Sequence, residues 1–251
     1  MIVEYHRPQT LDEALKLIGR PSPRTLPLGG GTLLSRATAE PIEVVDLQAL
    51  GLGNIRKSGK ELEIGATATL GALSGSQQAL PALKTAIGLE APLNLRNAGT
   101  VAGALVSADG RSTFAAALLA LDAKLTLQPN DEEILLGNFL PQREQTLRGK
   151  LITSVSIPLQ VKLSFDYVSR TPADKPIVCV ALARWPSGRA RLAVGGYGKS
   201  PLLAMDGTES EGIETAARNA FHEADDEWGS AEYRMDVGAS LAQRCLQAIQ
   251  S

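Results

Sequence analysis

The chain carries two glycine-rich stretches, LPLGGGTLLSR at residues 26–36 and LRNAGTVAGALVSADGRST at residues 95–113, and they determine which fold we expect. Both have few reactive side chains, and an alanine- and leucine-rich segment over 113–121 follows the second. Glycine lets a backbone approach a ligand closely, so that its N–H groups can point at an anion. A helix that starts after such a loop adds the positive end of its dipole. The two stretches are therefore either tight turns or two halves of one diphosphate site.

Known nucleotide-binding motifs do not fit these stretches. Neither contains G-x-G-x-x-G, and the strand EVVDL (43–47) lies too close to the first stretch to supply the usual ribose-binding acid. The segment AVGGYGKS (193–200) is similar to a phosphate loop, but Ala193 takes the place of the first glycine and Pro201 stands where a helix should begin. The residues alone therefore leave both interpretations open, tight turns or a diphosphate site made from two loops.

Composition excludes several functional classes. The 251-residue chain has a net charge of −2, and its lysines and arginines are scattered, which argues against a nucleic-acid surface. No apolar run approaches the roughly 20 residues of a membrane span, and the N-terminus lacks the apolar core of a signal peptide. Cys179 and Cys245 are far apart in sequence and suit a reducing compartment. We therefore expect a soluble cytoplasmic protein of mixed helix and sheet.

The sequence offers little catalytic or metal-binding chemistry. Neither His6 nor His222 has a cysteine or a second histidine at ligand spacing, so no metal site is expected. Two cysteines are too few for an iron–sulfur cluster, and no G-x-S-x-G motif occurs. We expect no catalytic acid or base. Asp109 and Asp174 are either polar contacts to a ligand or ordinary turn and surface carboxylates.

Local signals predict helices and strands in alternation up to about residue 160. A capping box at Thr10–Glu13 starts one helix, Ser112 can cap another over 113–121, and 81–91 is helical. A helical turn is expected at 33–37, and strands at 24–28, 42–47 and 123–128. The segment 61–70 is expected to begin as a strand and to end in a threonine-rich turn. The last hundred residues predict an antiparallel meander and a closing helix over 230–250, with strand segments at 151–158, 163–170, 176–185 and 189–198.

Several segments, taken in order, resemble the FAD-binding subunit of molybdenum hydroxylases, which is the medium subunit of carbon monoxide dehydrogenase and the flavin domain of xanthine dehydrogenase. The segments are YHRPQTLDEALKLI (5–18), LGGGTLL (28–34), VVDLQAL (44–50), LEIGATATL (62–70), LRNAGTVAGALVSAD (95–109) and SAEYRMDVGASLAQRCL (230–246). The resemblance covers nearly the whole chain. It implies an α+β fold, with a PCMH-type FAD-binding domain of two α/β subdomains over 1–160 and a small C-terminal domain of antiparallel sheet and helices over 161–251.

The resemblance also implies that both glycine-rich stretches wrap the FAD diphosphate. Carried over residue by residue, the cofactor-binding positions are Gly29, Gly30, Gly31, Thr32 and Leu33, then Thr100, Val101, Ala102, Gly103 and Ala104, and further along Asp109, Thr113, Ile152 and Asp166.

This chain departs from the family's pattern at several of these positions. The family usually has two glycines and a small polar residue where Ala102-Gly103-Ala104 stands, and Asp or Ser where Leu33 stands. Thr113 replaces a flavin-contacting aspartate, and Asp166 aligns with a basic residue. Lost polar contacts of about 0.5–1.5 kcal/mol each would weaken cofactor binding, whereas a backbone cradle does not depend on side-chain identity.

By resemblance, the chain is the electron-transfer subunit of a larger assembly. FAD would collect electrons and reduce NAD+ or another acceptor, with a molybdenum-cofactor large subunit and an iron–sulfur small subunit as partners. The alternative is a scaffold subunit of the same assembly that keeps the fold and has lost FAD.

Overall fold

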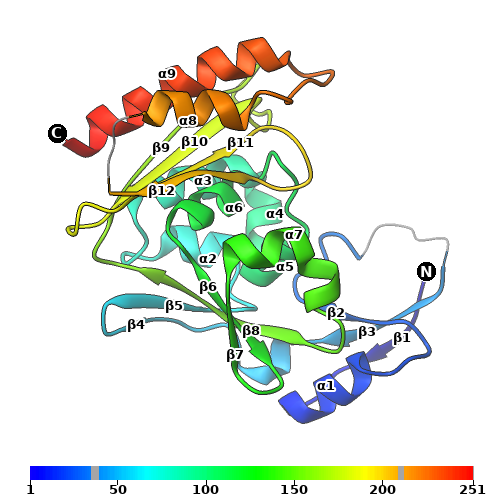
Figure 1. The fold of residues 1–251 in the computed structure, drawn as a ribbon. Coiled ribbons are helices and arrows are strands. Elements are labelled where there is room, and N and C mark those ends of the chain that lie inside the picture. The colour runs from blue at the N-terminus through cyan, green and yellow to red at the C-terminus, as the bar shows by residue number, and fades with distance from the viewer. Residues whose placement is uncertain (35–39, 209–211, 251) are drawn as a thin grey trace.

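The structure is a computed structural model that describes residues 1–34, 40–208 and 212–250. Within these residues the strands form three sheets, and most helices lie between the two larger sheets (Figure 1). The helical turn expected at 33–37 reaches beyond the described residues. No helix in the described ranges is long and apolar enough to cross a membrane.

The first sheet is parallel, has the order β1-β3-β2, and packs against a single helix. The capping box is present, because the Thr10 hydroxyl accepts from the Glu13 N–H, although the Glu13 carboxylate accepts from the N–H of Gln9 rather than Thr10. Ala14 of the helix packs on Val45 and Leu47. The elements are β1 (Ile2–His6), α1 (Leu11–Ile18), β2 (Thr25–Leu28), β3 (Ile42–Asp46) and a 3-10 turn (Gln48–Leu50).

The second sheet has five antiparallel strands in the order β4-β5-β8-β6-β7. The segment 151–158, which we expected in the C-terminal meander, lies between β5 and β6 instead. The segment 61–70 begins as a strand that ends at Gly65, as expected, and a short helix begins at Leu70 after the threonine-rich turn. The strands are β4 (Ile55–Ser58), β5 (Glu61–Gly65), β6 (Lys124–Gln128), β7 (Glu132–Leu135) and β8 (Leu151–Pro158).

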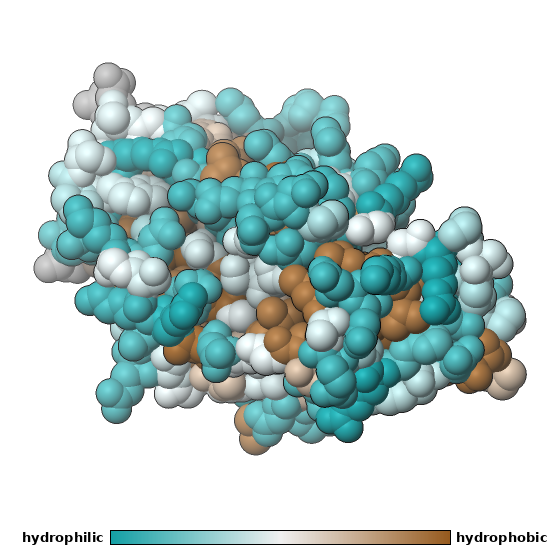
Figure 2. All heavy atoms as spheres, turned by 90° about the horizontal axis from the view of Figure 1, so that it is seen from below, coloured by the Kyte–Doolittle hydropathy of each residue, from teal (hydrophilic) through white to brown (hydrophobic). Residues whose placement is uncertain are grey.

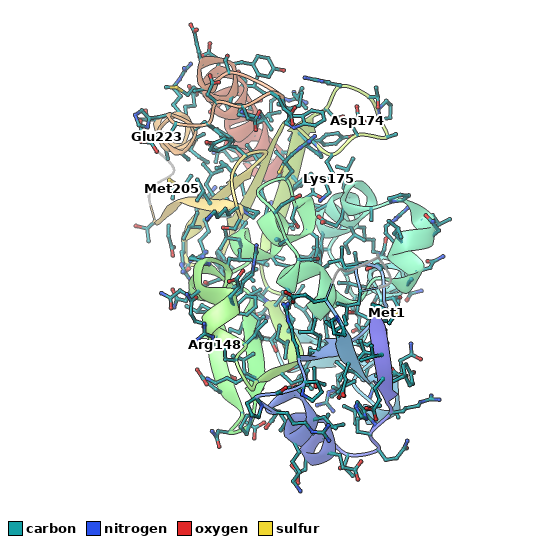
Figure 3. The ribbon with its side chains drawn as sticks, turned by 90° about the vertical axis from the view of Figure 1, so that its right-hand side faces the viewer. Met1, Arg148, Asp174, Lys175, Met205 and Glu223 are labelled. Carbon is teal, nitrogen blue, oxygen red and sulfur yellow. The ribbon has the colours of Figure 1, made fainter. Side chains whose placement is uncertain are left out.

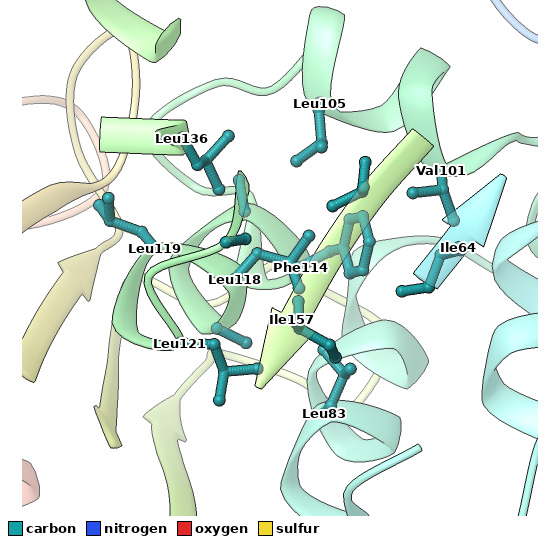
Figure 4. Packing of buried hydrophobic residues seen from close by; sticks show 14 of the residues in the cluster. Ile64, Leu83, Val101, Leu105, Phe114, Leu118, Leu119, Leu121, Leu136 and Ile157 are labelled. Carbon is teal, nitrogen blue, oxygen red and sulfur yellow. The ribbon is translucent and has the colours of Figure 1, made fainter. Parts of the chain in front are cut away.

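Six helices accompany this sheet, and one of them forms the centre of the core. All eight residues of α6 are buried, and Ser112 caps it as predicted by accepting from the Ala115 N–H. Phe114 and Leu118 pack with Ile157 and Leu83 (Figure 4). The helices are α2 (Leu70–Gly75), α3 (Pro81–Glu90), α4 (Leu93–Ala98), α5 (Val101–Val106), α6 (Thr113–Ala120) and α7 (Leu136–Thr146).

The third sheet is the predicted meander, with strand order β12-β11-β10-β9. Helices α8 and α9 cover its outer face and α6 its inner face, so β10 is buried along almost its whole length (Figure 1). The closing helix is confirmed, with Leu241, Cys245 and Ile249 buried on one face. The elements are β9 (Lys162–Val168), β10 (Val178–Arg184), β11 (Ala190–Gly195), β12 (Leu202–Gly207), α8 (Ile213–Ala220) and α9 (Ala231–Gln250).

A cluster of charges joins the turn after α6 to this sheet. Arg191, which is 5% exposed, contacts Asp206 (Nη1–Oδ2 2.5 Å) and Asp122 (Nη1–Oδ1 3.2 Å). Arg189 binds Asp206 through two nitrogens, at 2.8 and 2.7 Å. These hydrogen bonds from Arg189 hold the pKa of the Asp206 carboxyl below its ordinary value; burial opposes this and Arg191 adds to it.

We expect the Asp206 carboxylate to stabilise the fold above the unfolded-state pKa of about 4 and to lose this effect as the pH falls through its lower folded-state pKa. Asp206→Asn should therefore lower the free energy of unfolding at pH 7. The variant should also lose less of this free energy than wild type when the pH is lowered. Urea unfolding from pH 7 to 2 measures both. Asp236→Asn, in the exposed pair with Arg218, is the control and should change stability little. Equal acid dependence in wild type and Asp206→Asn would contradict the expectation.

Candidate functional site at the two glycine stretches

The first stretch leaves β2 as a loop with bare backbone. Gly31 has a φ of +68°, a left-handed conformation that glycine adopts without strain. Within the described residues, the N–H groups of Gly29, Gly30 and Thr32 donate to no backbone or side-chain acceptor. Three unengaged N–H groups in four consecutive residues can together bind an anion. We call residues 29–32 the first loop.

The second stretch is mostly helical, contrary to our expectation of a bare loop. Helices α4 and α5 occupy it, and only Gly99 and Thr100 remain as a turn between them. We call this pair the second turn. Thr100 is the N-cap of α5, because its hydroxyl accepts from the Gly103 N–H at 3.2 Å. The cap and the apolar residues that follow explain why the segment is helical despite its small side chains.

Most backbone N–H groups of the second stretch already have partners. Val101 donates to Ala68 (2.8 Å) and Ala102 to Ala66 (3.1 Å), and both acceptors precede α2. Gly103 and Ala104 donate to Thr100, through its hydroxyl and its carbonyl. The N–H groups of these four residues, which the resemblance placed around a diphosphate, are therefore bonded within the protein. The first loop is the part of the site that keeps N–H groups for a ligand.

The first loop and the second turn pack directly against each other. A Cβ on Gly30 would overlap the carbonyl of Ala98, and a Cβ on Gly29 would lie 2.6 Å from the Thr100 hydroxyl. A Cβ on Gly99 would lie 3.9 Å from the Thr32 methyl group. Only glycine permits this approach. The two stretches are thus parts of one site, and its bare N–H groups next to a threonine hydroxyl suit a diphosphate.

Beyond α5, residues 109–113 lead from the site to the C-terminal sheet. Asp109 is exposed, and its Oδ1 accepts from the Arg111 N–H at 3.0 Å and lies 3.4 Å from Lys175 Nζ. Lys175 and Asp174 lie side by side in the loop after β9 (Figure 3). Asp174 is half-buried, and its N–H donates to the Thr171 carbonyl in a turn.

Thr113 does not have the ligand-facing position that the resemblance implied. Its side chain is fully buried, and its hydroxyl donates to the Ala86 carbonyl (2.7 Å) and to Glu90 (3.2 Å). The Glu90 carboxylate also accepts from the Ser112 hydroxyl and the Phe114 N–H, both at 2.9 Å. Glu90 therefore occupies the N-terminus of α6, where a negative charge is favoured.

Sequence reasoning missed this role of Glu90. Helical spacing placed it on the apolar face of the helix over 81–91, and no local signal paired it with Ser112. Its side chain is only 9% exposed, and Lys175 Nζ lies 3.6 Å from its Oε1. A glutamate on the buried face of a helix is a sign of such a pairing, because buried charges need a partner.

We expect Thr113→Asp to destabilise the protein. The new carboxylate would lie beside the buried Glu90 carboxylate, in a space where the hydroxyl now donates. An uncompensated buried charge costs about 3–5 kcal/mol. Urea unfolding should show this loss at pH 7, and Thr113→Ser, which keeps the donor, should lose much less. A Thr113→Asp protein as stable as wild type would contradict the placement of Thr113.

The side chains of Asp166 and Ile152 make their contacts within the fold. Asp166 points from β9 toward α9, where its Oδ2 is 2.9 Å from Arg244 Nε. The neighbouring Phe165 packs into the core on the opposite face of β9. The basic residue expected at position 166 is thus replaced by an acid that pairs with the outer helix. The Ile152 side chain is 3% exposed and packs in the same core as Phe114.

Contacts of Gly110 and Arg111 join the loop after α5 to the C-terminal part of the chain. The Gly110 N–H donates to Gly198 (2.9 Å) and its carbonyl accepts from Gly196 (2.6 Å), so the GGYG segment pairs with the loop after α5. A Cβ on Gly110 would overlap the Tyr197 carbonyl. Arg111 donates to the Pro176 carbonyl at 3.1 Å and stacks on Trp228. The glycines of 195–198 therefore serve packing between loops.

Comparison with known proteins identifies the family of this chain. Residues 1–160 match the family described as FAD binding domain in molybdopterin dehydrogenase. The 6-hydroxypseudooxynicotine dehydrogenase complex subunit alpha of Paenarthrobacter nicotinovorans is 30% identical, over 97% of this chain and 93% of that protein. The carbon monoxide dehydrogenase medium chain of Afipia carboxidovorans is 25% identical, over 97% and 95%.

A solved structure shares the fold. Carbon monoxide dehydrogenase from Oligotropha carboxidovorans superimposes with a TM-score of 0.80 at 24% identity, over 98% of this chain and 96% of that chain. The expected α+β fold is thereby confirmed, as is the expected family. The chain belongs to the family of FAD-binding medium subunits of molybdenum hydroxylases and is an oxidoreductase subunit.

Proposed function

We propose that the first loop binds the diphosphate of FAD while the second turn supports it from the other side. The observation that carries this proposal is the combination of unengaged N–H groups at Gly29, Gly30 and Thr32 with the close packing of Gly30 on Ala98. Several N–H groups that converge on one spot are a good site for a diphosphate. The Thr100 side chain is buried beside Gly29, and its hydroxyl accepts from the Gly103 N–H, so Thr100 fixes the second turn against the first loop.

The remaining residues of the two stretches have different roles in this proposal. Val101, Ala102, Gly103 and Ala104 keep their N–H groups inside the protein and hold the second turn in place. Gly31 gives the first loop its left-handed bend. Leu33 and Asp109 are exposed and open to a ligand. Thr113, Ile152 and Asp166 act in the fold rather than on FAD.

We further propose that the subunit takes electrons from iron–sulfur clusters of a partner and delivers them through FAD to NAD+ or another acceptor. FAD supplies the redox chemistry when bound, and the residues of this chain bind and orient it. Cys179 and Cys245 are both buried, and two thiols cannot form the four-thiolate set of a common cluster. The clusters and the molybdenum cofactor therefore come from a small and a large partner subunit.

In this proposal the chain consists of two domains. Residues 1–160 form the FAD-binding domain of the proposal, and residues 161–251 form a C-terminal domain that packs on it through α6 and the loop at Gly110. The relatives named as subunits or medium chains of dehydrogenases support the partner assignment. We also propose a cytoplasmic location, because the two free thiols suit a reducing compartment.

Purification from the native host tests the assembly. A tagged chain should co-purify with a molybdenum-containing large subunit and an iron–sulfur small subunit, and the complex should bleach the flavin absorbance on reduction and restore it with NAD+ or a dye acceptor. The isolated chain should hydroxylate nothing. Recovery of the chain alone, under conditions that preserve other multi-subunit complexes of the host, would contradict the assembly.

A further inference from the structure

The edge strand of the first sheet brings three possible metal ligands together away from the glycine stretches. Glu4 and His6 are two residues apart on β1, so their side chains share one face of the sheet. Glu43 lies directly opposite Glu4 on β3. Two carboxylates opposite each other on neighbouring strands repel, and such a pair needs a positive charge nearby. Among the residues that the structure describes, these three form a group of ligand atoms within 4.8 Å of one another.

The spacing of His6 and Glu43 fits a metal ion, because His6 Nε2 lies 2.9 Å from Glu43 Oε2. Glu4 Oε1 lies 3.8 Å from the other ring nitrogen, Nδ1, so the Glu4 side chain must turn toward Nε2 to bind the same ion. Metal bonds to imidazole nitrogen and carboxylate oxygen are about 2.0–2.2 Å long. Two such ligands at a right angle are about 2.9 Å apart, so His6 and Glu43 have the spacing of neighbouring ligands in an octahedral site.

The burial and the net charge of these three side chains also favour a bound cation. The Glu43 side chain is 9% exposed and His6 is 18% exposed, whereas Glu4 is 59% exposed and leaves an open side for water. Arg20 Nη1, at 3.7 Å from Glu43, offsets one of the two carboxylate charges. With neutral imidazole the group then keeps one negative charge, which favours a cation over a further anion.

We propose that Glu4, His6 and Glu43 bind a divalent transition-metal ion such as Mn²⁺, Co²⁺ or Zn²⁺. Imidazole and carboxylate ligands together suit these ions better than Ca²⁺ or Mg²⁺, which take oxygen ligands. The ion would fasten the exposed edge strand β1 to the buried strand β3, which in turn pairs with β2. The underside of the molecule, where this sheet lies, is largely hydrophilic with grouped apolar patches (Figure 2).

The sequence did not reveal this site. Glu4 and His6 show only a two-residue spacing, and Glu43 lies far along the chain, so no ligand motif is visible. The parallel pairing of β1 with β3 brings them together. The proposal is independent of FAD, because the first loop follows β2 and the three ligands lie on the other two strands.

Titration of the untagged, chelator-treated protein with Co²⁺ tests the site, because the visible bands of Co²⁺ change with its ligands. One Co²⁺ per chain should bind, and Zn²⁺ should compete with it and raise the Tm by about 5 °C. His6→Gln and Glu43→Gln should weaken binding about tenfold or more, and the exposed Glu4→Gln should weaken it less. His222→Gln, which removes the other histidine, should change nothing.

Circular dichroism of each variant shows whether the fold is kept. If a substitution at the less exposed His6 or Glu43 unfolds β1, the exposed Glu4→Gln variant still tests the site. The proposal would be overturned if the wild-type protein bound no Co²⁺. It would also be overturned if the wild-type, His6→Gln and Glu4→Gln proteins bound Co²⁺ with equal affinity. His6 would then be a hydrogen-bonded bridge between two carboxylates.

Discussion

Gly30→Val should strongly weaken FAD binding and destabilise the protein at the same time. A Cβ at this position overlaps the Ala98 carbonyl, so the first loop and the second turn must separate. Because the obstacle is backbone, no side-chain rotation relieves it. We expect affinity for FAD to fall about 100-fold or more, equivalent to about 2.7 kcal/mol, and the free energy of unfolding to fall by about 3 kcal/mol. Fluorescence titration with FAD and urea unfolding measure the two effects.

Gly75→Val is the matched control for this change. A Cβ on Gly75 meets nothing within 4 Å, and the residue lies on the surface at the end of α2. The Gly75→Val protein should retain wild-type affinity for FAD. A Gly30→Val protein that binds FAD as well as the Gly75→Val protein would show that the contact between the two stretches is not needed for the cofactor.

Arg234→Met should cost about 3–5 kcal/mol of stability, the largest loss that we expect from a single side chain outside the glycine stretches. Arg234 is fully buried in the first turn of α9. Its guanidinium donates to the carbonyls of Ala224 (2.5 Å) and Gly229 (2.6 Å) and binds Asp226 at 2.6 Å. Methionine is of similar length but leaves these acceptors without their donor.

The carboxyl of Asp226 shows how strongly this arrangement favours a charge. Burial raises its pKa, but the hydrogen bonds from Arg234 and from the N–H groups of Trp228 and Gly229 outweigh burial, and the net pKa is lowered. Arg218→Met is the control, because Arg218 pairs with Asp236 on the surface and should cost less than about 1 kcal/mol. Equal stability of the two variants in urea would contradict the structural role of Arg234.

The elements that the sequence predicted well are those with a clear period and a cap. The helix over 113–121 has Ser112 as its cap, and the closing helix presents Leu241, Cys245 and Ile249 at helical spacing. The helices α4 and α5 were missed because six residues are too few to show a period, and because the small residues around Gly99 suggested a loop.

The candidate site was predictable in part. The glycine triplet and Thr100 marked the two places that meet, but the packing of Gly30 on Ala98 depends on how α4 approaches β2. The orientation of Asp166 was not predictable, since both faces of β9 are covered and alternation does not say which face meets α9. Glu90 and Thr113 meet only because α3 and α6 pack together, and sequence alone does not show this.

Titration of the purified chain with FAD and, separately, with FMN tests the binding of FAD at the first loop most directly. Both ligands carry the same isoalloxazine ring, but only FAD has the diphosphate that the N–H groups of Gly29, Gly30 and Thr32 are proposed to bind. We expect FAD to bind in one equivalent with a shifted absorbance and quenched fluorescence, ADP to compete with it, and FMN to bind at least about tenfold more weakly. Equal binding of FMN, or no response to FAD by folded protein, would contradict the account, and the second result would favour a scaffold subunit that has lost its cofactor.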